Sequence, residues 1–253
     1  MDMNGVAAIV TGAASGLGAA TARALADKGA KVALLDMNVA AAAEVAAEIG
    51  GIAVQCDVSD AASAEAAVGD ACGIHGAARI AVSCAGIAPP GKVVGRDGPQ
   101  DLAVFANTIN INLIGTFNIM RLVAADMKAL EPLEGGERGL IVNTASIAAF
   151  EGQIGQVAYA ASKGGVASMT LPAARELARS GIRVLAIAPG IFGTPMLFGL
   201  PQDVQNSLGA EVPFPSRLGD PAEYAKLVLH MADNMMLNGE VIRLDGALRM
   251  APG

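Results

Sequence analysis

The sequence contains little cysteine or histidine, and both shortages exclude a kind of site. Cys56, Cys72 and Cys84 have neither the spacing of metal ligands nor the even number of a disulfide framework. Cys56 and Cys84 stand in apolar runs, so we expect them to be small buried side chains. His75 and His230 are isolated from each other, so no metal site is predicted. A reducing cytoplasm is the expected compartment for such a chain.

Positive charge is also scarce. The 253 residues include 17 Lys and Arg against 24 Asp and Glu, which gives a formal net charge of −7. Binding to a phosphate backbone needs clustered basic side chains, so no nucleic-acid partner is expected. No run reaches the roughly 18 uninterrupted apolar residues of a membrane-spanning helix, so no membrane association is expected. Residues 1–5 carry no basic segment, which argues against a secretory signal.

Linkers, low-complexity tracts and repeats are missing too, so we expect a single domain that spans residues 1–253. Within it, short apolar runs alternate with longer helical patterns. We expect strands at Val6–Val10, Val32–Leu35, Ala53–Cys56, Arg79–Ser83, Leu140–Asn143, Arg183–Ala188 and Val241–Leu244, and helices at Leu17–Lys28, Val39–Ile49, Ala61–Cys72, Leu102–Ala129 and Tyr159–Ser180. Wholly apolar strands that alternate with helices predict an α/β fold, a Rossmann-type doubly wound parallel seven-stranded sheet of order 3-2-1-4-5-6-7 with helices on both faces.

Three irregular segments interrupt this alternation: Pro89–Asp101, Glu131–Gly139 and Gly193–Pro221. Irregular segments beside the carboxyl ends of parallel strands are where ligands bind. The third segment contains five prolines and one short helical stretch, Gln202–Leu208. We therefore predict a substrate lid at residues 193–221.

A glycine-rich turn, TGAASGLG at residues 11–18, separates the first strand from the first helix. Its G-x-x-x-G-x-G spacing differs from the common G-x-G-x-x-G fingerprint, but the physical basis is the same. Glycines permit a tight turn and let the backbone approach a pyrophosphate, and the helix N-terminus offers free N–H groups. The candidate cofactor-binding residues of this turn are Gly12, Ser15, Gly16, Leu17 and Gly18.

An acidic residue, Asp36, ends the second strand 18 residues after Gly18. A carboxylate at this place hydrogen-bonds the adenosine ribose hydroxyls and repels a 2′-phosphate. Neither the glycine turn nor Met37 supplies a basic side chain for such a phosphate. The sequence therefore predicts NAD rather than NADP as cofactor, although Asp36 could also be an ordinary strand-end cap.

The ends of the third and fourth strands carry further candidates for the adenosine part of the cofactor. Asp57 can hydrogen-bond the adenine amino group, with Val58 packed nearby, although an isolated Asp57 would more often be a turn residue. Cys84, Ala85 and Gly86 end the fourth strand, and their small side chains leave room for adenosine and ribose.

Tyr159 and Lys163 are four residues apart on a predicted helix, so they lie on one face, one turn apart. An ammonium group there favours phenolate over phenol, and an oxidised nicotinamide adds a second positive charge. Both effects lower the pKa of the tyrosine toward the working pH, as a general acid–base requires. The pattern Y-x-x-x-K alone is weak, since a partly exposed aromatic and a solvated lysine would also produce it.

Two further polar residues strengthen that assignment. Ser146 stands just past the fifth strand, at the carboxyl end of the sheet, where its hydroxyl can hydrogen-bond the reacting oxygen of a substrate. Its alternative role is a helix or loop cap. Asn112 falls inside a long predicted helix, where asparagine is unfavourable. It can hold a water that links Lys163 to solvent, or it can mark a local helix kink.

This ordered set of motifs resembles the short-chain dehydrogenase/reductase family, from about residue 5 to about residue 248. The matching stretches are TGAASGLG at 11–18, Asp57, CAG at 84–86, Asn112, Ser146, YAASK at 159–163 and APG at 188–190. The resemblance implies that Ser146, Tyr159 and Lys163 carry catalysis and that Asn112 supports a proton relay. It also implies that the segment after the sixth strand, with Pro189, Gly190, Phe192 and Thr194, binds the nicotinamide carboxamide.

Longer stretches resemble one branch of the family, the type II 3-hydroxyacyl-CoA dehydrogenases. They are residues 143–165, 187–197, 212–225 and 237–250, together with the EGGERG loop at 134–139. The branch implies oxidation of (3S)-3-hydroxyacyl-CoA by NAD, activity on other secondary alcohols including steroids, a place in fatty acid metabolism, and a homotetramer. Substrate CoA phosphates would need basic side chains, for which Arg217, Lys92 and Arg96 are candidates. Pro89–Asp101 departs most from the branch.

Two competing functions remain at this stage. A 3-oxoacyl-carrier-protein reductase has the same fold, but that class usually prefers NADP, against which Asp36 argues. A dinucleotide-binding scaffold without catalysis would typically have lost the tyrosine or the lysine, and this chain has both.

Overall fold

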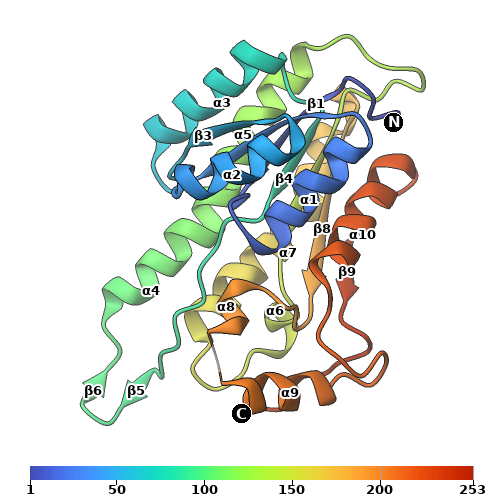
Figure 1. Cartoon of the computed structure of the whole chain (residues 1–253). Helices are drawn as coiled ribbons and strands as arrows, with labels where there is room; N and C mark the ends of the chain where they lie inside the picture. Colours follow the sequence, from blue (N-terminus) through green and yellow to red (C-terminus); the bar gives the residue numbers. More distant parts are fainter. Residues whose placement is uncertain (200, 253) are drawn as a thin grey trace.

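A single parallel sheet forms the centre of the molecule (Figure 1). The structure is a computed structural model that describes residues 1–199 and 201–252. The seven strands are β1 (Ala7–Thr11), β2 (Lys31–Asp36), β3 (Ile52–Gln55), β4 (Ile80–Ser83), β7 (Gly139–Thr144), β8 (Ile182–Pro189) and β9 (Val241–Leu244). They lie in the order β3-β2-β1-β4-β7-β8-β9, every pair parallel. The predicted fold class and strand order are confirmed.

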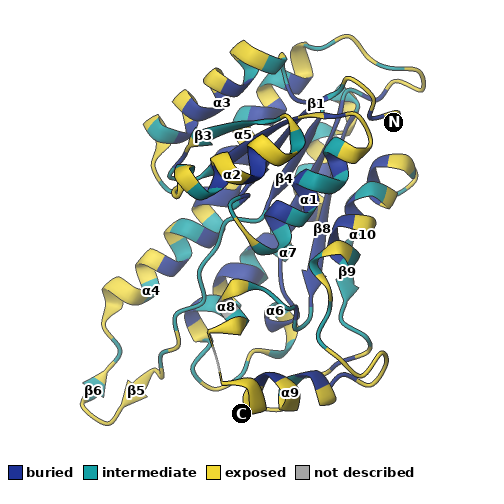
Figure 2. Cartoon of the chain, viewed as in Figure 1, coloured by how far each residue is buried: buried dark blue, intermediate teal, exposed yellow. Residues whose placement is uncertain are grey.

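The two faces of the sheet bury separate hydrophobic clusters, as the continuous apolar strands predict (Figure 2). Successive residues of β1 point to opposite faces, so Ile9 belongs to one cluster and Val10 to the other. Helices α1 (Gly16–Asp27), α2 (Val39–Ile49) and α10 (Pro221–Asp233) cover the Val10 face. Helices α3 (Ala61–His75), α5 (Gly115–Ala129) and α7 (Val157–Leu177) cover the other.

The helix expected over Leu102–Ala129 is present, but a π-turn divides it. It consists of α4 (Leu102–Ile109), the π-helical turn η1 (Asn110–Ile114) and α5. By length and composition this helix could also cross a membrane, and 33% of its most apolar 18-residue stretch is buried. Ile119 and Val123 of α5 pack into the sheet core.

The irregular segments contain short elements, of which only the helix expected at Gln202–Leu208 had a sequence pattern; it is confirmed as part of α9 (Gln202–Ala210). Pro89–Asp101 contains a hairpin, β5 (Val94–Gly95) and β6 (Gly98–Pro99), that projects from the body beyond the start of α4 (Figure 1). The predicted lid contains α8 (Pro195–Phe198) and α9. A four-residue helix, α6 (Ala148–Glu151), follows β7, and a 3-10 turn, η2 (Ala178–Ser180), ends α7.

The Glu131–Gly139 loop lies at the end of the sheet opposite to the one expected for a ligand-binding segment. Arg79, just before β4, donates to the carbonyl of Glu131 at 2.8 Å. Glu137 in the loop pairs with Arg183 at the start of β8, at 2.8 Å, with both side chains buried. Because the loop enters β7, it stands at the amino ends of the strands, and its role is to close that end of the core.

Candidate active site

A cavity of about 710 Å³ opens at the carboxyl ends of the strands. Its size is within the range of small-molecule sites, about 300–1,000 Å³. Residues that the sequence assigns to the cofactor come together in its wall: Gly12, Ser15, Gly16, Leu17, Gly18, Asp36, Asp57, Val58, Cys84, Ala85, Gly86, Tyr159, Lys163, Pro189, Gly190, Phe192 and Thr194. Ser146 lines the same cavity. The chain therefore gathers one site from six of its strands.

The glycine turn is shaped for close approach of a ligand to the backbone. Gly12 has a left-handed φ of +63°, and a Cβ atom on it would lie 2.7 Å from the backbone nitrogen of Ala85. Helix α1 starts directly after Ser15 with no side-chain cap and no acidic residue in its first turn. Its N–H groups and positive dipole end therefore suit the pyrophosphate of a dinucleotide.

The two acidic residues at the strand ends differ in how they are held. Asp36 accepts the backbone N–H of Ala14 at 3.0 Å and that of Asn38 at 2.9 Å, which links the glycine turn to β2. Asp57 accepts both the N–H and the hydroxyl of Ser59, as a turn residue does. Both carboxylates still line the cavity, and Lys163 is the one cation among its described lining residues. No described lining residue near Asp36 could neutralise a 2′-phosphate.

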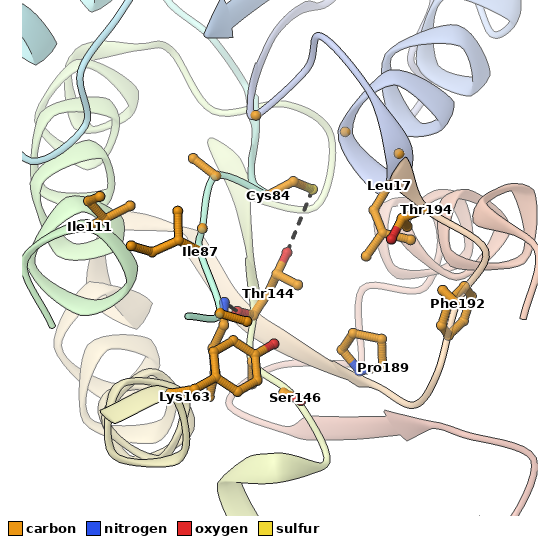
Figure 3. Close-up of a pocket in the computed structure, with 18 of the residues that line it drawn as sticks. Leu17, Cys84, Ile87, Ile111, Thr144, Ser146, Lys163, Pro189, Phe192 and Thr194 are labelled. Carbon is orange, nitrogen blue, oxygen red and sulfur yellow. Dashed lines mark hydrogen bonds between the residues drawn. The ribbon is translucent and has the colours of Figure 1, made fainter. Parts of the chain in front are cut away.

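Tyr159, Lys163 and Ser146 meet at one end of the cavity, and Figure 3 labels Lys163 and Ser146 in its wall. Helix α7 places the ammonium nitrogen of Lys163 5.8 Å from the centre of the Tyr159 ring. Ser146 is buried just beyond β7, and its hydroxyl accepts the N–H of Ala148 at 3.1 Å. That bond is the loop cap considered as its alternative role, and it leaves the hydroxyl hydrogen free to donate.

The lowering of the Tyr159 pKa that Lys163 and an oxidised nicotinamide together are expected to produce stays a prediction. Burial raises the pKa of Tyr159 above its usual value, and a hydrogen bond with Ser146 opposes that rise only in part. Lys163 is itself buried and donates to the carbonyl of Thr144 at 2.7 Å. Burial lowers the pKa of Lys163 to about 8. Two desolvated groups therefore share this end of the site, and the phenol stays protonated without a further positive charge.

Asn112 lies behind the cavity and is fully buried in the π-turn. Its side-chain oxygen accepts the N–H of Ile87, and its amide donates to the carbonyl of Ile87, both at 2.8 Å. The second amide hydrogen bonds the hydroxyl of Ser162 at 3.0 Å. Asn112 therefore joins the end of β4 to α7 next to Lys163. The local distortion of the helix is present, and a water relay through this residue stays a prediction.

Sequence patterns did not point to several other residues of the site. Thr144 holds Lys163, and its hydroxyl bonds the hydroxyl of fully buried Tyr224 at 2.8 Å. A dashed line in Figure 3 joins the same Thr144 hydroxyl to Cys84. The cavity wall also contains residues, most of them apolar, that the sequence did not assign; among them are Ile147, Ala148, Gln153, Gln156, Leu197, Leu208 and Met250. They come from four separate segments, which sequence spacing alone does not bring together.

The three candidate CoA-binding cations lie outside this cavity. Arg217 is engaged by Glu223 in an exposed ion pair of 2.7 Å. Lys92 and Arg96 are exposed on the β5–β6 segment. The three cysteines are free, with Cys56 buried and the other two partly buried. Among residues 1–199 and 201–252, no group of three or more His, Cys, Asp or Glu side chains could hold a metal ion.

Comparison with known proteins gives matches over nearly the whole chain. The sequence model of short chain dehydrogenases matches residues 6–205. The human protein 3-hydroxyacyl-CoA dehydrogenase type-2 is 52% identical over 255 residues, covering 99% of this chain and 98% of that protein. Its namesake from Drosophila melanogaster is 51% identical, covering 96% and 97%. A crystal structure of 3-hydroxyacyl-CoA dehydrogenase type-2 from Mycobacterium avium superposes with a TM-score of 0.94 at 44% identity, over 98% of both chains.

Proposed function

The chain belongs to the short chain dehydrogenase family, and from that membership we propose that it is an NAD-dependent 3-hydroxyacyl-CoA dehydrogenase. Family membership makes it an oxidoreductase with a nicotinamide cofactor that acts on a CH–OH group. The observation that carries the proposal is the meeting of Tyr159, Ser146 and Lys163 at one end of the dinucleotide-shaped cavity.

The proposed chemistry divides the work between protein and cofactor. The bound nicotinamide supplies the hydride acceptor. The phenolate of Tyr159 takes the hydroxyl proton of the substrate as the C–H electron pair leaves as hydride. Ser146 donates a hydrogen bond to the reacting oxygen, and Lys163 keeps positive charge near the phenolate. The product is the 3-ketone, and reversal of these steps reduces it.

NAD is proposed over NADP because of the charge at the adenosine end. Asp36 presents a carboxylate there, and no basic side chain accompanies it among the described lining residues. The same argument disfavours a 3-oxoacyl-carrier-protein reductase, which usually prefers NADP. Gly12, Ser15, Gly16, Leu17 and Gly18 would hold the pyrophosphate at the N-terminus of α1.

The proposal of an acyl-CoA substrate is supported by the relatives of this chain. Those of 51–53% identity are named for 3-hydroxyacyl-CoA dehydrogenase activity of type 2, while a human (3R)-3-hydroxyacyl-CoA dehydrogenase is 36% identical. The higher identity favours the (3S) substrate that the type II branch implies. Steroids and other secondary alcohols are the second substrate class, supported by the many apolar side chains that line the cavity. We also propose a lid at 193–221, a homotetramer, a cytoplasmic location and a role in fatty acid metabolism.

The test is a substrate panel with NAD. Purified protein is assayed with (3S)- and (3R)-3-hydroxybutyryl-CoA, a hydroxysteroid and simple secondary alcohols, and kcat/KM is compared. We expect the (3S)-acyl-CoA to be the best substrate, and Tyr159→Phe to lose about 10²–10⁴-fold in kcat with the fold intact. A faster non-CoA alcohol would overturn the substrate and keep the reaction class. Near-normal turnover by Tyr159→Phe would overturn the mechanism.

A further inference from the structure

A cluster of charged side chains fixes the segment after β9 beside the cavity. One oxygen of Glu151, at the end of α6, accepts Arg243 at 2.7 Å and lies 3.3 Å from Arg249. Its other oxygen accepts the backbone N–H of Met250 at 3.1 Å. Asp245 bridges the same two arginines, at 2.7 and 3.2 Å. The hydrogen bond from Arg243 lowers the pKa of Glu151, which keeps this carboxylate ionised.

An apolar cluster joins the same segment to the catalytic loop and to the predicted lid. Ile147, which follows Ser146 directly, is buried together with Val212 from the lid and Leu248 from the segment after β9. Met250 packs against this cluster and is only partly exposed. One side of Met250 is therefore held by packing and by its backbone bond to Glu151, while its side chain remains at the cavity.

Met250 lines the cavity together with Ser146. Other apolar lining residues include Ile147, which follows Ser146 and packs in the same cluster as Met250, and Leu197 and Leu208 of the predicted lid. An apolar wall next to the point of hydride transfer suits an aliphatic chain attached to the reacting carbon. Since the lid and the catalytic loop both contact the same cluster, the position of Met250 depends on neither alone.

We propose that the Met250 side chain forms the part of the cavity wall that limits the length of the substrate's acyl group. We propose further that Glu151 is the positioning residue that holds Met250 in place. The proposal rests on the proposed function, because it takes the ligand to be the acyl chain of a 3-hydroxyacyl-CoA. Glu151 does not line the cavity. It acts through Arg243, Arg249 and the backbone of Met250, so its loss should alter selectivity before it alters the chemical step.

The first test replaces the wall itself. Met250→Ala and wild type are assayed with (3S)-3-hydroxyacyl-CoA substrates of increasing chain length. Removal of a side chain from an apolar pocket changes discrimination between neighbouring chain lengths, so we expect the long-to-short ratio of kcat/KM to rise by about tenfold. Met236→Ala is the matched control, because Met236 is 94% exposed and does not line the cavity. An unchanged ratio in Met250→Ala overturns the proposal.

The second test changes Glu151, which holds Met250, and leaves Met250 itself unchanged. In Glu151→Gln we expect the KM for the acyl substrate to rise by about tenfold, as for loss of charged hydrogen bonds, with kcat and the KM for NAD nearly unchanged. Glu48→Gln removes a similar ion pair with Arg23, exposed and 2.6 Å long, and should change none of the three. If kcat falls and the KM for NAD rises by a similar factor, the role of Glu151 is merely structural and its assignment is overturned.

The two proposals fail in distinguishable ways. If wild type oxidises no 3-hydroxyacyl-CoA but does oxidise other secondary alcohols, the proposed substrate is wrong. Met250→Ala can then be compared with wild type on 2-alkanols of increasing length, where the same rise in the long-to-short ratio is expected from the same wall. Absence of that rise overturns the role of Met250 independently of the substrate.

Discussion

The chain has only two tyrosines, and their surroundings differ. Tyr224 is fully buried under the sheet ends, where burial raises its pKa well above the usual value. Tyr159 lies partly open to the cavity, and burial raises its pKa as well. A buried phenol stays protonated because desolvation penalises the charged phenolate. A general base at Tyr159 therefore needs the positive charge of an oxidised nicotinamide in addition to Lys163.

A phenolate titration can test this need for positive charge, and the signal is clean because the chain has no tryptophan. Without cofactor, near-ultraviolet absorbance should show no phenolate around neutral pH, because burial raises the pKa of Tyr159 above its usual value. Oxidised NAD adds positive charge, so one phenolate should then form at a lower pH than it does without cofactor. Tyr159→Phe should abolish that step and leave Tyr224 silent. Ionisation near pH 8 without cofactor would contradict this account.

Asp36 provides a second test at the residue scale. Asp36→Ala removes the carboxylate that hydrogen-bonds the ribose hydroxyls and repels a 2′-phosphate, so the KM for NAD should rise by about tenfold or more and the preference for NAD over NADP should narrow. Initial rates with both cofactors measure this. Asp70→Ala, which removes an exposed carboxylate on α3, is the control. A wild type that already prefers NADP would refute the assignment.

Sequence reasoning found those residues of the site that depend on local spacing. Tyr159 and Lys163 are one helical turn apart, and the glycine turn is contiguous, so their neighbours in space follow from their positions in the chain. Thr144 and Tyr224 meet only because α10 packs over the ends of β4 and β7. Their partnership depends on tertiary packing across about a third of the chain, which no local pattern contains.

At the scale of elements, the strands were predictable because burial on both faces demands continuous apolar runs. Val241–Leu244 was predicted with its exact bounds, and the other strands within about two residues. The four-residue helices α6 and α8 are too short for a periodic pattern. Helix α10, unlike α6 and α8, has a recognisable start in the sequence. Asp220 and Glu223 form a capping box around Pro221, a pattern that predicts a helix N-terminus.

The π-turn is a departure from the regular α-helix that the sequence predicts, and it lies next to the candidate active site. Asn110–Ile114 continues an apolar helical sequence, which predicts regular α-helix. The extra residue in the turn lets Asn112 reach both Ile87 and Ser162. π-turns within α-helices often mark functional sites. Periodicity over 28 residues cannot locate the insertion of one residue, so the structure was needed to find it.

The whole molecule exposes an apolar surface along the helix α4–η1–α5. Ile114 and Phe117 are 47% and 52% exposed, and their spacing of three residues places them on one face. Leu102 at the start of the same helix is 75% exposed. An apolar stripe of this kind typically marks a protein interface. A second copy of this chain is the proposed partner, as in the homotetramer that the family resemblance implies.

A single charge placed on that surface should disrupt the assembly. Phe117→Glu introduces a carboxylate whose burial in an apolar interface is costly, so we expect the proposed tetramer to dissociate into smaller species. Sedimentation velocity at several concentrations measures the change. Phe214→Glu is the matched control, because Phe214 is 83% exposed and lies on the segment before α10, away from this helix. A monomeric wild type would refute the tetramer, and a tetrameric Phe117→Glu would refute this helix as its interface. The unfolding temperature of the variant should stay close to that of dissociated wild type, because Phe117 is not part of the buried core of its own subunit.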